Sequence, residues 1–212
     1  MSVPVQLVVG LGNPGADYAM TRHNVGFMVA DAVAEALNSK DREKQQFKSL
    51  IRQIRVAGRT VVIAKPLTFM NRSGDAIVKL VNAFDLTPGE VFVIYDCLDL
   101  PLGRLRIRQT GGSGGHRGMD SVLAALGTQT VPRLRVGIGR QNERDAVDHV
   151  LSPWSNDETR LVKEIVEAAA DAVLMALRAG VERTMNTYNV WKPSEHKTVT
   201  IGTDRTTKET GN

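Results

Sequence analysis

The chain has 212 residues, of which 42% are hydrophobic and 24% charged, a balance typical of a folded globular protein and too apolar for a disordered one. No stretch approaches the roughly 18 apolar residues of a membrane span, and Met1–Pro4 shows no signal-peptide pattern. The single cysteine, Cys97, excludes an internal disulfide and is typical of a reducing compartment. We therefore expect one cytoplasmic α/β domain over residues 1–191 and a polar, flexible tail over residues 192–212.

The net charge of +4 is unevenly distributed along the chain. Residues 104–144 carry eight arginines against two acidic residues, so this segment is strongly basic while the rest of the chain is slightly acidic. The planar guanidinium fork suits phosphate groups, and a local basic excess of this kind is typical of proteins that bind polyanions. Solvated strand faces would give the same composition, so charge alone leaves both interpretations open.

The N-terminal half alternates strand-like and helix-like patterns. Asn24 stands where the N-cap of the first helix is expected, and the pair Ala57–Gly58 predicts a hairpin turn. The predicted elements are, in chain order, a strand over 5–9, a helix over 25–37, strands over 47–56 and 60–64, a helix over 73–84 and a strand over 91–95.

The C-terminal half adds two strands in which arginines alternate with apolar residues. In the first, Leu105 and Ile107 lie on the face opposite Arg106 and Arg108, as strand geometry requires. The predicted elements are a strand over 104–108, a helix over 119–126, a strand over 133–138 and a long helix over 158–179 that Gly180 ends or interrupts. Together the patterns predict an α/β, single-domain three-layer fold with a twisted mixed sheet flanked by helices.

The segment Gly10–Gly15 matches the glycine pattern of dinucleotide-binding proteins. That site requires a helix that begins at the glycines, so that its N-terminus meets the pyrophosphate. Here about nine residues, including Pro14, separate the glycines from the predicted helix, and Asp31 falls inside that helix instead of ending a second strand. A nucleotide-dependent oxidoreductase is therefore the weakest of the functions considered.

Polar side chains gather in four loops, three of which directly follow predicted strands. They offer Asn13, Asn71 and Asp96, and His23 stands at the edge of the first helix. Because loops at the carboxyl ends of strands meet at one crevice in open α/β sheets, we expect these side chains to lie together. The fourth loop, residues 111–118, is glycine-rich and precedes a helix.

These residue types favour hydrolysis by an activated water. A histidine beside a carboxylate can act as a general base, and asparagine amides can orient a carbonyl and stabilise an oxyanion. The histidines and Cys97 show no metal-ligand spacing, and no nucleophilic serine or thiolate motif is present. We expect no metal and no cofactor, with the alternative that His23 is only a capping or packing residue.

Four blocks of this sequence resemble those of the bacterial-type peptidyl-tRNA hydrolases. The blocks are Val9–Gly15 with Tyr18 and Thr21–Gly26, Lys65–Gly74, Tyr95–Gly103, and Gly111–Gly118 continuing to Pro132–Gly139. They occur in order and in register from residue 5 to about residue 190. The resemblance implies a monomeric enzyme that hydrolyses the ester between a peptide and the 3′ ribose of tRNA, and so recycles tRNA from stalled translation.

The resemblance also implies roles for individual residues at the catalytic centre. His23 would be the general base, and Asp96 would be the carboxylate that orients it. Asn13 would help to distinguish a peptidyl group from a free aminoacyl group, and Asn71 would position the water or the substrate carbonyl.

Other residues would bind the substrate. Met70 and Phe69 would line the site for the peptide and the terminal nucleotide, and Tyr18 would contact the tRNA end. The arginines expected to bind tRNA near its acceptor end and 5′ phosphate are Arg106, Arg108, Arg133 and Arg135.

This sequence departs from the family pattern at Arg117, where the family usually has asparagine between the histidine and glycine of the fourth block. Arginine cannot accept a hydrogen bond, so Arg117 is expected to contact the substrate as a donor or through a phosphate. Cys97 replaces a commonly acidic residue and is expected to be a small buried filler. Arg117 also favours an alternative function, a catalytically weakened relative that only binds RNA, whereas the intact polar residues of the loops favour the hydrolase.

Overall fold

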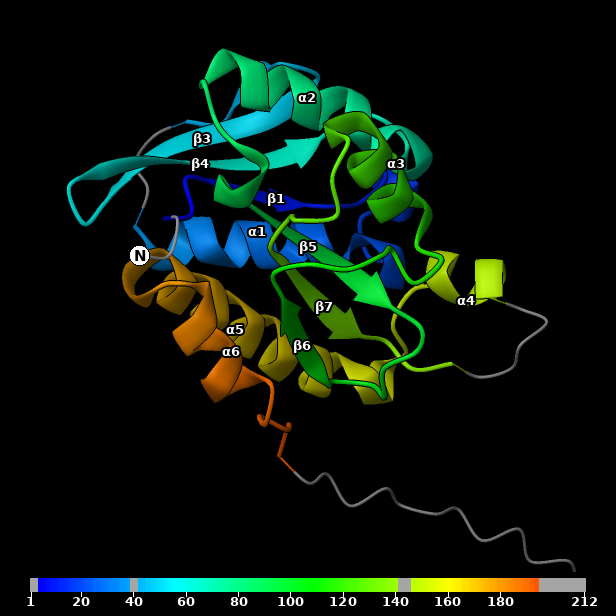
Figure 1. Ribbon diagram of the computed structural model, residues 1–212. Helices are drawn as coiled ribbons and strands as arrows, with labels where there is room; N and C mark the ends of the chain where they lie inside the picture. Colours follow the sequence, from blue (N-terminus) through cyan, green and yellow to red (C-terminus); the bar gives the residue numbers. More distant parts are fainter. Residues whose placement is uncertain (1–3, 39–41, 141–145, 195–212) are drawn as a thin grey trace, which may run out of the picture.

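The computed structural model describes residues 4–38, 42–140 and 146–194, and these form one mixed sheet with helices on both faces (Figure 1). Its strands are β1 (Leu7–Gly10), β2 (Lys44–Gln46), β3 (Ser49–Val56), β4 (Arg59–Pro66), β5 (Val91–Cys97), β6 (Leu105–Arg108) and β7 (Arg133–Gly137). Their order is β2-β3-β4-β1-β5-β7-β6. Pairing is parallel between β4, β1, β5 and β7, and antiparallel between β2, β3 and β4 and between β6 and β7. The predicted mixed sheet is confirmed.

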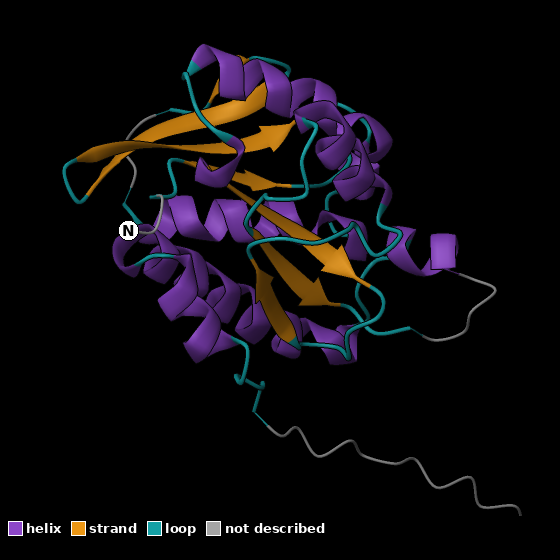
Figure 2. Ribbon diagram, in the orientation of Figure 1, coloured by secondary structure: helices purple, strands orange, loops and turns teal. Residues whose placement is uncertain are grey.

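Helices cover both faces of this sheet (Figure 2). They are α1 (Val25–Ala36), α2 (Ser73–Ala83), α3 (Arg117–Leu126), α4 (Ala146–Leu151), α5 (Asn156–Ala179) and α6 (Val181–Tyr188). The shorter 3₁₀ turns are η1 (Ala16–Tyr18), η2 (Arg22–Asn24), η3 (Met70–Arg72) and η4 (Pro88–Glu90). None of the helices in the described parts of the chain combines the length and the apolar character that crossing a membrane requires.

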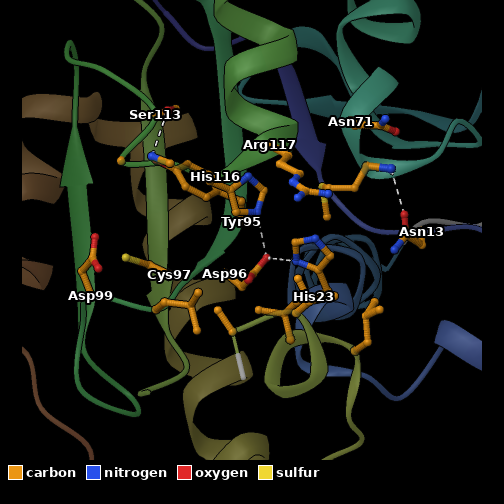
Figure 3. A pocket seen from close by; sticks show the side chains of 18 of the residues that line it. Asn13, His23, Asn71, Tyr95, Asp96, Cys97, Asp99, Ser113, His116 and Arg117 are labelled. Carbon is orange, nitrogen blue, oxygen red and sulfur yellow. Dashed lines mark hydrogen bonds and ion pairs between the residues drawn. The ribbon is translucent and has the colours of Figure 1, made fainter. Parts of the chain in front are cut away.

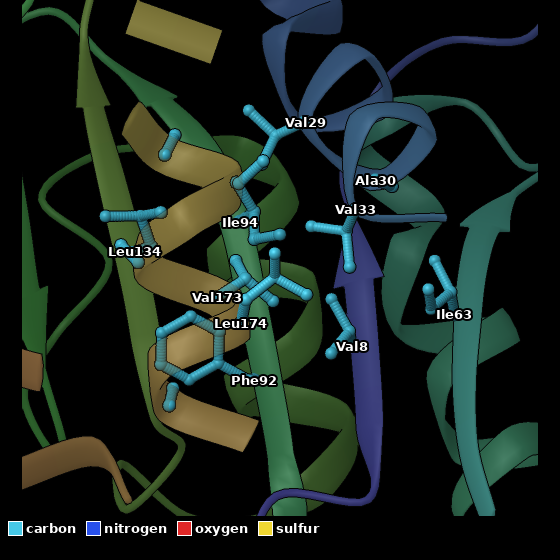
Figure 4. Close-up of a cluster of buried hydrophobic side chains, with 14 of the residues drawn as sticks. Val8, Val29, Ala30, Val33, Ile63, Phe92, Ile94, Leu134, Val173 and Leu174 are labelled. Atoms are coloured by element: carbon cyan, nitrogen blue, oxygen red, sulfur yellow. The ribbon is translucent and has the colours of Figure 1, made fainter. Parts of the chain in front are cut away.

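The central strands are buried on both faces, which gives the fold its three layers. On β1, Val8 belongs to the hydrophobic cluster under α1 and α5, whereas Leu7 and Val9 belong to the cluster under α2 and α3. Figure 4 shows the first cluster, where Val33 of α1 and Val173 of α5 pack over the strands. Burial on both faces explains why these strands are uninterrupted apolar runs without alternation.

The hairpins differ from the prediction at one turn. Ala57 and Gly58, with φ of 49° and 80°, connect β3 to β4 as predicted. A second turn at Phe47 and Lys48, with φ of 53° and 56°, connects β2 to β3, so β3 begins two residues later than predicted. This turn could not be predicted from the sequence, because neither residue is glycine, asparagine or proline, the usual signals of a turn.

The C-terminal region contains two helices that the sequence did not predict, α4 and α6. Gly180, with φ of 86°, ends α5 and separates it from α6. Of the tail predicted over 192–212, Ser194 donates from its backbone and hydroxyl to Glu164 of α5. Residues 195–212 lie outside the described residues.

Close packing at two glycines places the first loop over the edge of the sheet. A Cβ atom at Gly26 would lie 2.4 Å from the carbonyl oxygen of Leu11 and 2.5 Å from that of Ile94, and one at Gly10 would lie 2.1 Å from the carbonyl oxygen of Gly26. These glycines therefore serve the contact of β1 with α1 and β5. The loop over 11–24 projects beyond that contact and holds the side chains described next.

Candidate active site

Four loops and α4 surround one cavity of about 540 Å³ at the carboxyl ends of the central strands (Figure 3). The loops follow β1, β4 and β5 and precede α3, which is the convergence that the strand pattern predicts. Of the residues expected at the site, those that line the cavity are Asn13, His23, Phe69, Met70, Asn71, Asp96 and Arg117. Tyr18, in η1, lies outside this lining.

A histidine–carboxylate pair lies at the centre of the cavity. The Nδ1 atom of His23, in η2, lies 2.8 Å from Oδ1 of Asp96, whose side chain is only 1% exposed at the end of β5. Because the ionised carboxylate only accepts, Nδ1 carries a proton in this contact, and in the neutral ring the lone pair is on Nε2. This contact orients the His23 ring, and His23 makes no side-chain cap bond in η2, so the capping alternative is not supported.

A second imidazole shares the same carboxylate oxygen. Nε2 of His116 lies 2.9 Å from Oδ1 of Asp96, and the rings of the two histidines have centroids 5.2 Å apart. Burial by itself raises the pKa of Asp96, but the two imidazoles outweigh burial and hold this pKa below its ordinary value of 3.8. Asp96 is therefore ionised at neutral pH. His116 was not among the residues predicted for the site, although its glycine-rich loop was singled out from the sequence.

These three groups also form the one cluster of potential metal ligands found among the described residues. One ligand atom from each of His23, Asp96 and His116 lies within 4.8 Å of the others. Sequence spacing could not show this, because the three residues come from separate loops. Both imidazoles point at the same oxygen at hydrogen-bond distance, so the arrangement fits a shared hydrogen bond better than a coordination shell.

Asn13 is fixed by its neighbours on three sides. Its backbone NH donates to Oδ1 of Asn24 at 2.8 Å, and its carbonyl accepts from Nδ2 of Asn24 at 3.0 Å. Its own Oδ1 accepts from the backbone NH of Met70 at 2.8 Å. Asn24 stands at the predicted N-cap position of α1, but its side chain makes no cap hydrogen bond there, because its amide bonds the backbone of Asn13. The Nδ2 donors of Asn13 are left for a ligand.

The loop after β4 supplies an apolar wall. Met70 is buried at the start of η3, whereas Phe69 is 59% exposed and Asn71 is exposed beside it. A Cβ atom at Gly118 would lie 2.4 Å from Sδ of Met70 and 3.0 Å from the His116 ring, so only glycine leaves room for both side chains. Helix α4 extends this wall with Val147, which is 55% exposed.

Arg22 holds the segment that carries His23 against the connection between α4 and α5. Its guanidinium donates to the hydroxyl of Ser152 at 2.7 Å, to the carbonyl of Pro153 at 2.7 Å and to Glu158 at 2.6 Å. It also lies 5.0 Å from the ring of Trp154. No role for Arg22 was predicted, since nothing in the sequence showed that a residue 130 positions away lies beside it.

The arginines of β6 and β7 lie on one face of the sheet, as the alternation predicts. Arg106 pairs with Arg135 across the two strands, and Leu105 and Ile107 are buried on the opposite face. Arg108 is exposed and Arg106 is half-buried. Arg135 reaches Sγ of Cys97 at 2.9 Å and lies 3.7 Å from Asp99.

Arg133 lies on this face as well, but it is covered and not exposed as expected. It is 1% exposed, and its guanidinium donates to four backbone carbonyls, those of Gly111, Gly112, Gln129 and Val131. Burial lowers its pKa below the ordinary range of arginine, and the group still remains charged at neutral pH. Arg133 therefore fixes the glycine-rich loop from beneath and is removed from the expected tRNA-binding set. Alternation alone could not show that this loop covers it.

The fold and the site define a class of protein: a three-layer α/β protein with a buried carboxylate, an oriented histidine base and a neighbouring arginine face. Comparison with known proteins identifies the family. The sequence profile of the peptidyl-tRNA hydrolases matches residues 7–198. The peptidyl-tRNA hydrolases of Desulforamulus reducens and Aquifex aeolicus are 48% and 44% identical to the chain over 87% of it, and over 89% and 96% of their own lengths.

Solved structures agree with the sequence comparison. The crystal structure of peptidyl-tRNA hydrolase from Acinetobacter baumannii is similar, with a TM-score of 0.82 at 31% identity over 89% of this chain and 96% of that one. A peptidyl-tRNA hydrolase in complex with N-propanol gives 0.83 at 30% identity over 90% and 97%. The chain belongs to the peptidyl-tRNA hydrolase family, and the resemblance noted in the sequence is confirmed.

The place of Arg133 is tested by its removal. Arg133→Met deletes the side-chain donors to four backbone carbonyls and is expected to lower the free energy of unfolding by about 3 kcal/mol or more. Arg106→Met, on the same face, is expected to change it by less than about 0.5 kcal/mol. Urea unfolding followed by circular dichroism measures both. Equal stability of the two variants would contradict the structural role of Arg133.

Proposed function

We propose that this protein hydrolyses the ester that joins a peptide to the 3′ ribose of tRNA, with His23 as the general base. The observation that carries the proposal is the 2.8 Å contact between Nδ1 of His23 and buried Asp96 within the cavity of about 540 Å³. Family membership supplies the substrate class, since the similar proteins are named peptidyl-tRNA hydrolases.

The reaction follows from the state of the imidazole. Nε2 of His23 takes a proton from water as the water oxygen bonds to the ester carbonyl carbon, and Asp96 stabilises the imidazolium that forms. The tetrahedral intermediate then expels the 3′ oxygen of the ribose, which receives the proton back from His23. The products are a peptide with a free carboxyl group and tRNA with a free 3′ hydroxyl. A positioned base contributes about 10²–10⁴-fold to such a rate.

Asn13 offers a physical basis for preferring peptidyl over aminoacyl groups. Its Oδ1 is already occupied by the backbone NH of Met70, so only its Nδ2 donors face a ligand. A donor can bind the amide carbonyl of a peptide but cannot accept from the free ammonium of an aminoacyl group. In the proposal Asn71 orients the attacking water or the carbonyl, where one amide donor to the oxyanion is worth roughly 10²–10³-fold.

The remaining contacts divide between the two halves of the substrate. Phe69 and Met70 pack against the peptide and the terminal nucleotide, and Tyr18 contacts the tRNA end from outside the cavity. The arginine face, now Arg106, Arg108 and Arg135, binds backbone phosphates near the acceptor end. Recognition through phosphates and shape would allow one enzyme to serve many tRNAs. We extend the proposal to a monomer that works in the cytoplasm, where translation produces the substrate.

The alternative function, an RNA-binding relative with weakened catalysis, finds no support. All four polar residues expected at the centre of the site line one cavity, and the relatives found are named as hydrolases. Arg117, which favoured the alternative, is exposed at the mouth of the cavity and leaves the pair formed by His23 and Asp96 intact.

Removal of the base is the direct test of the reaction. His23→Ala is expected to lower kcat for N-acetyl-aminoacyl-tRNA by at least about 10²-fold, because no other group at the cavity replaces the lone pair of its Nε2. Release of free tRNA, followed on acid gels, measures the rate, and thermal unfolding confirms that the variant is folded. A folded variant with parental turnover would refute the assignment.

The arginine face is tested through the salt dependence of binding. Arg106→Gln with Arg108→Gln is expected to raise KM far more than it lowers kcat, and to reduce the slope of log KM against log salt by about one per lost phosphate contact. The control is Arg178→Gln, which removes an exposed arginine from the end of α5 on the other face of the sheet. Parental KM and slope in the double variant would exclude this face from tRNA binding.

Arg117 is expected to contribute binding energy and not chemistry. Among the described residues it has no hydrogen bond or ion pair, and it stands in the first turn of α3, where a cation is unfavourable for the helix. Arg117→Asn is therefore expected to raise KM by about 3–10-fold with nearly parental kcat and undiminished Tm. A kcat that rises many-fold in Arg117→Asn would show instead that arginine impairs the catalytic step.

A further inference from the structure

His116 is bound at both of its ring nitrogens, which fixes its protonation state. As the N-cap of α3, its Nδ1 accepts from the backbone NH of Met119 at 3.1 Å. Its Nε2 contacts Oδ1 of Asp96 at 2.9 Å, and its side chain is 9% exposed. A backbone NH always donates, so Nδ1 must be bare and the proton of the neutral ring must be on Nε2.

This tautomer makes His116 a permanent donor to Asp96. A second proton on Nδ1 would face the NH of Met119, so the cap bond and the donation to Asp96 are made together only by the ring with its proton on Nε2. Oδ1 of Asp96 consequently accepts two N–H groups, one from His116 and one from Nδ1 of His23.

The N–H groups of His23 and His116 share the negative charge of one oxygen, Oδ1 of Asp96. A carboxylate that faces a histidine alone favours the protonated imidazolium, which cannot act as a base. A second N–H donor on the same oxygen neutralises part of that charge and still leaves the hydrogen bond that orients His23.

We propose that His116 is a positioning residue for the hydrolysis proposed above: its Nε2–H holds Asp96 in place and moderates the carboxylate charge, so that His23 stays oriented yet unprotonated. This inference rests on the proposed role of His23 as the base.

No other group at the cavity duplicates this contact. Tyr95 of β5 has its ring 4.7 Å from the His116 ring, and burial raises the pKa of Tyr95, so its hydroxyl stays neutral. Arg117 of α3 is exposed, and Asp99, which follows β5, is 3.5 Å from Arg140 and 3.7 Å from Arg135. Cys97 contacts Arg135. Among the described residues the hydrogen bonds of Asp96 Oδ1 come from the two histidines.

His116 has two contacts, the cap of α3 and the hydrogen bond to Asp96, and two substitutions remove them one at a time. His116→Asn places an acceptor where Nδ1 stands and keeps the cap, but its amide is too short to reach Asp96. His116→Gln places an amide donor where Nε2 stands and gives up the cap. His116→Ala loses both contacts. The measurement is kcat/KM for N-acetyl-aminoacyl-tRNA as a function of pH, beside the Tm of each variant.

The acid limb of the plot of kcat/KM against pH is expected to move only in variants that lose the N–H donor to Asp96. His116→Asn and His116→Ala should move the pH of half-maximal rate upward by about one unit, while His116→Gln keeps the parental profile. Tm should follow the cap instead, with His116→Asn above His116→Gln. An unmoved acid limb in His116→Asn, or one in His116→Gln that moves as far as in His116→Ala, would overturn the proposal.

A measurement on the unaltered protein keeps the inference testable if the variants do not fold. The chain has only four histidines, so the ring nitrogens can be assigned by two-bond ¹H–¹⁵N correlation across pH 5–8. A proton held on Nε2 of His116 throughout supports the proposal, and a proton on Nδ1, or titration to the imidazolium, overturns it. Because this experiment needs no substrate, an inactive protein with the expected tautomer would contradict only the proposed hydrolysis.

Discussion

The site depends on one buried carboxylate. Asp96 ends β5, a strand that lies between two parallel neighbours and is buried along its length. A charge that is buried away from water needs hydrogen-bond donors to replace its hydration. Here the donors are the imidazoles of His23 and His116, which come from two other loops. The chemistry and the local stability therefore share one interaction, because the bond that solvates Asp96 also orients the base.

The surrounding loops are built to make that convergence possible. Gly26 allows α1 to lie against the carbonyl ends of β1 and β5, and Gly118 leaves the space that the His116 ring and Met70 both occupy. Buried hydrogen bonds of the Asn13 and Asn24 side-chain amides then fix Asn13 in the cavity that His23 also lines. Each of these contacts fixes a backbone segment or a side chain that lines the cavity.

The charges of the molecule are divided in the same way between structure and binding. The guanidinium of Arg133 donates to four backbone carbonyls beneath the glycine-rich loop, whereas Arg106 and Arg108, on the neighbouring strand, have no such partners among the described residues. The net charge of +4 therefore describes neither role. An arginine face and an apolar wall at Phe69 would suit the two chemically different halves of the proposed substrate, a peptide joined to tRNA.

Local pattern alone was enough to predict the mixed α/β sheet, most helices, the alternation of β6 and the gathering of Asn13, His23 and Asp96, because each of these depends on neighbours in sequence or on a rule for strand ends. Only the tertiary structure decided contacts between distant segments. In the folded protein the glycine-rich loop covers Arg133, and the side-chain amide of Asn24 bonds the backbone of Asn13 instead of capping α1. His116 contacts the same oxygen of Asp96 as His23. Periodicity specifies which face a residue occupies, but what covers that face is set by packing.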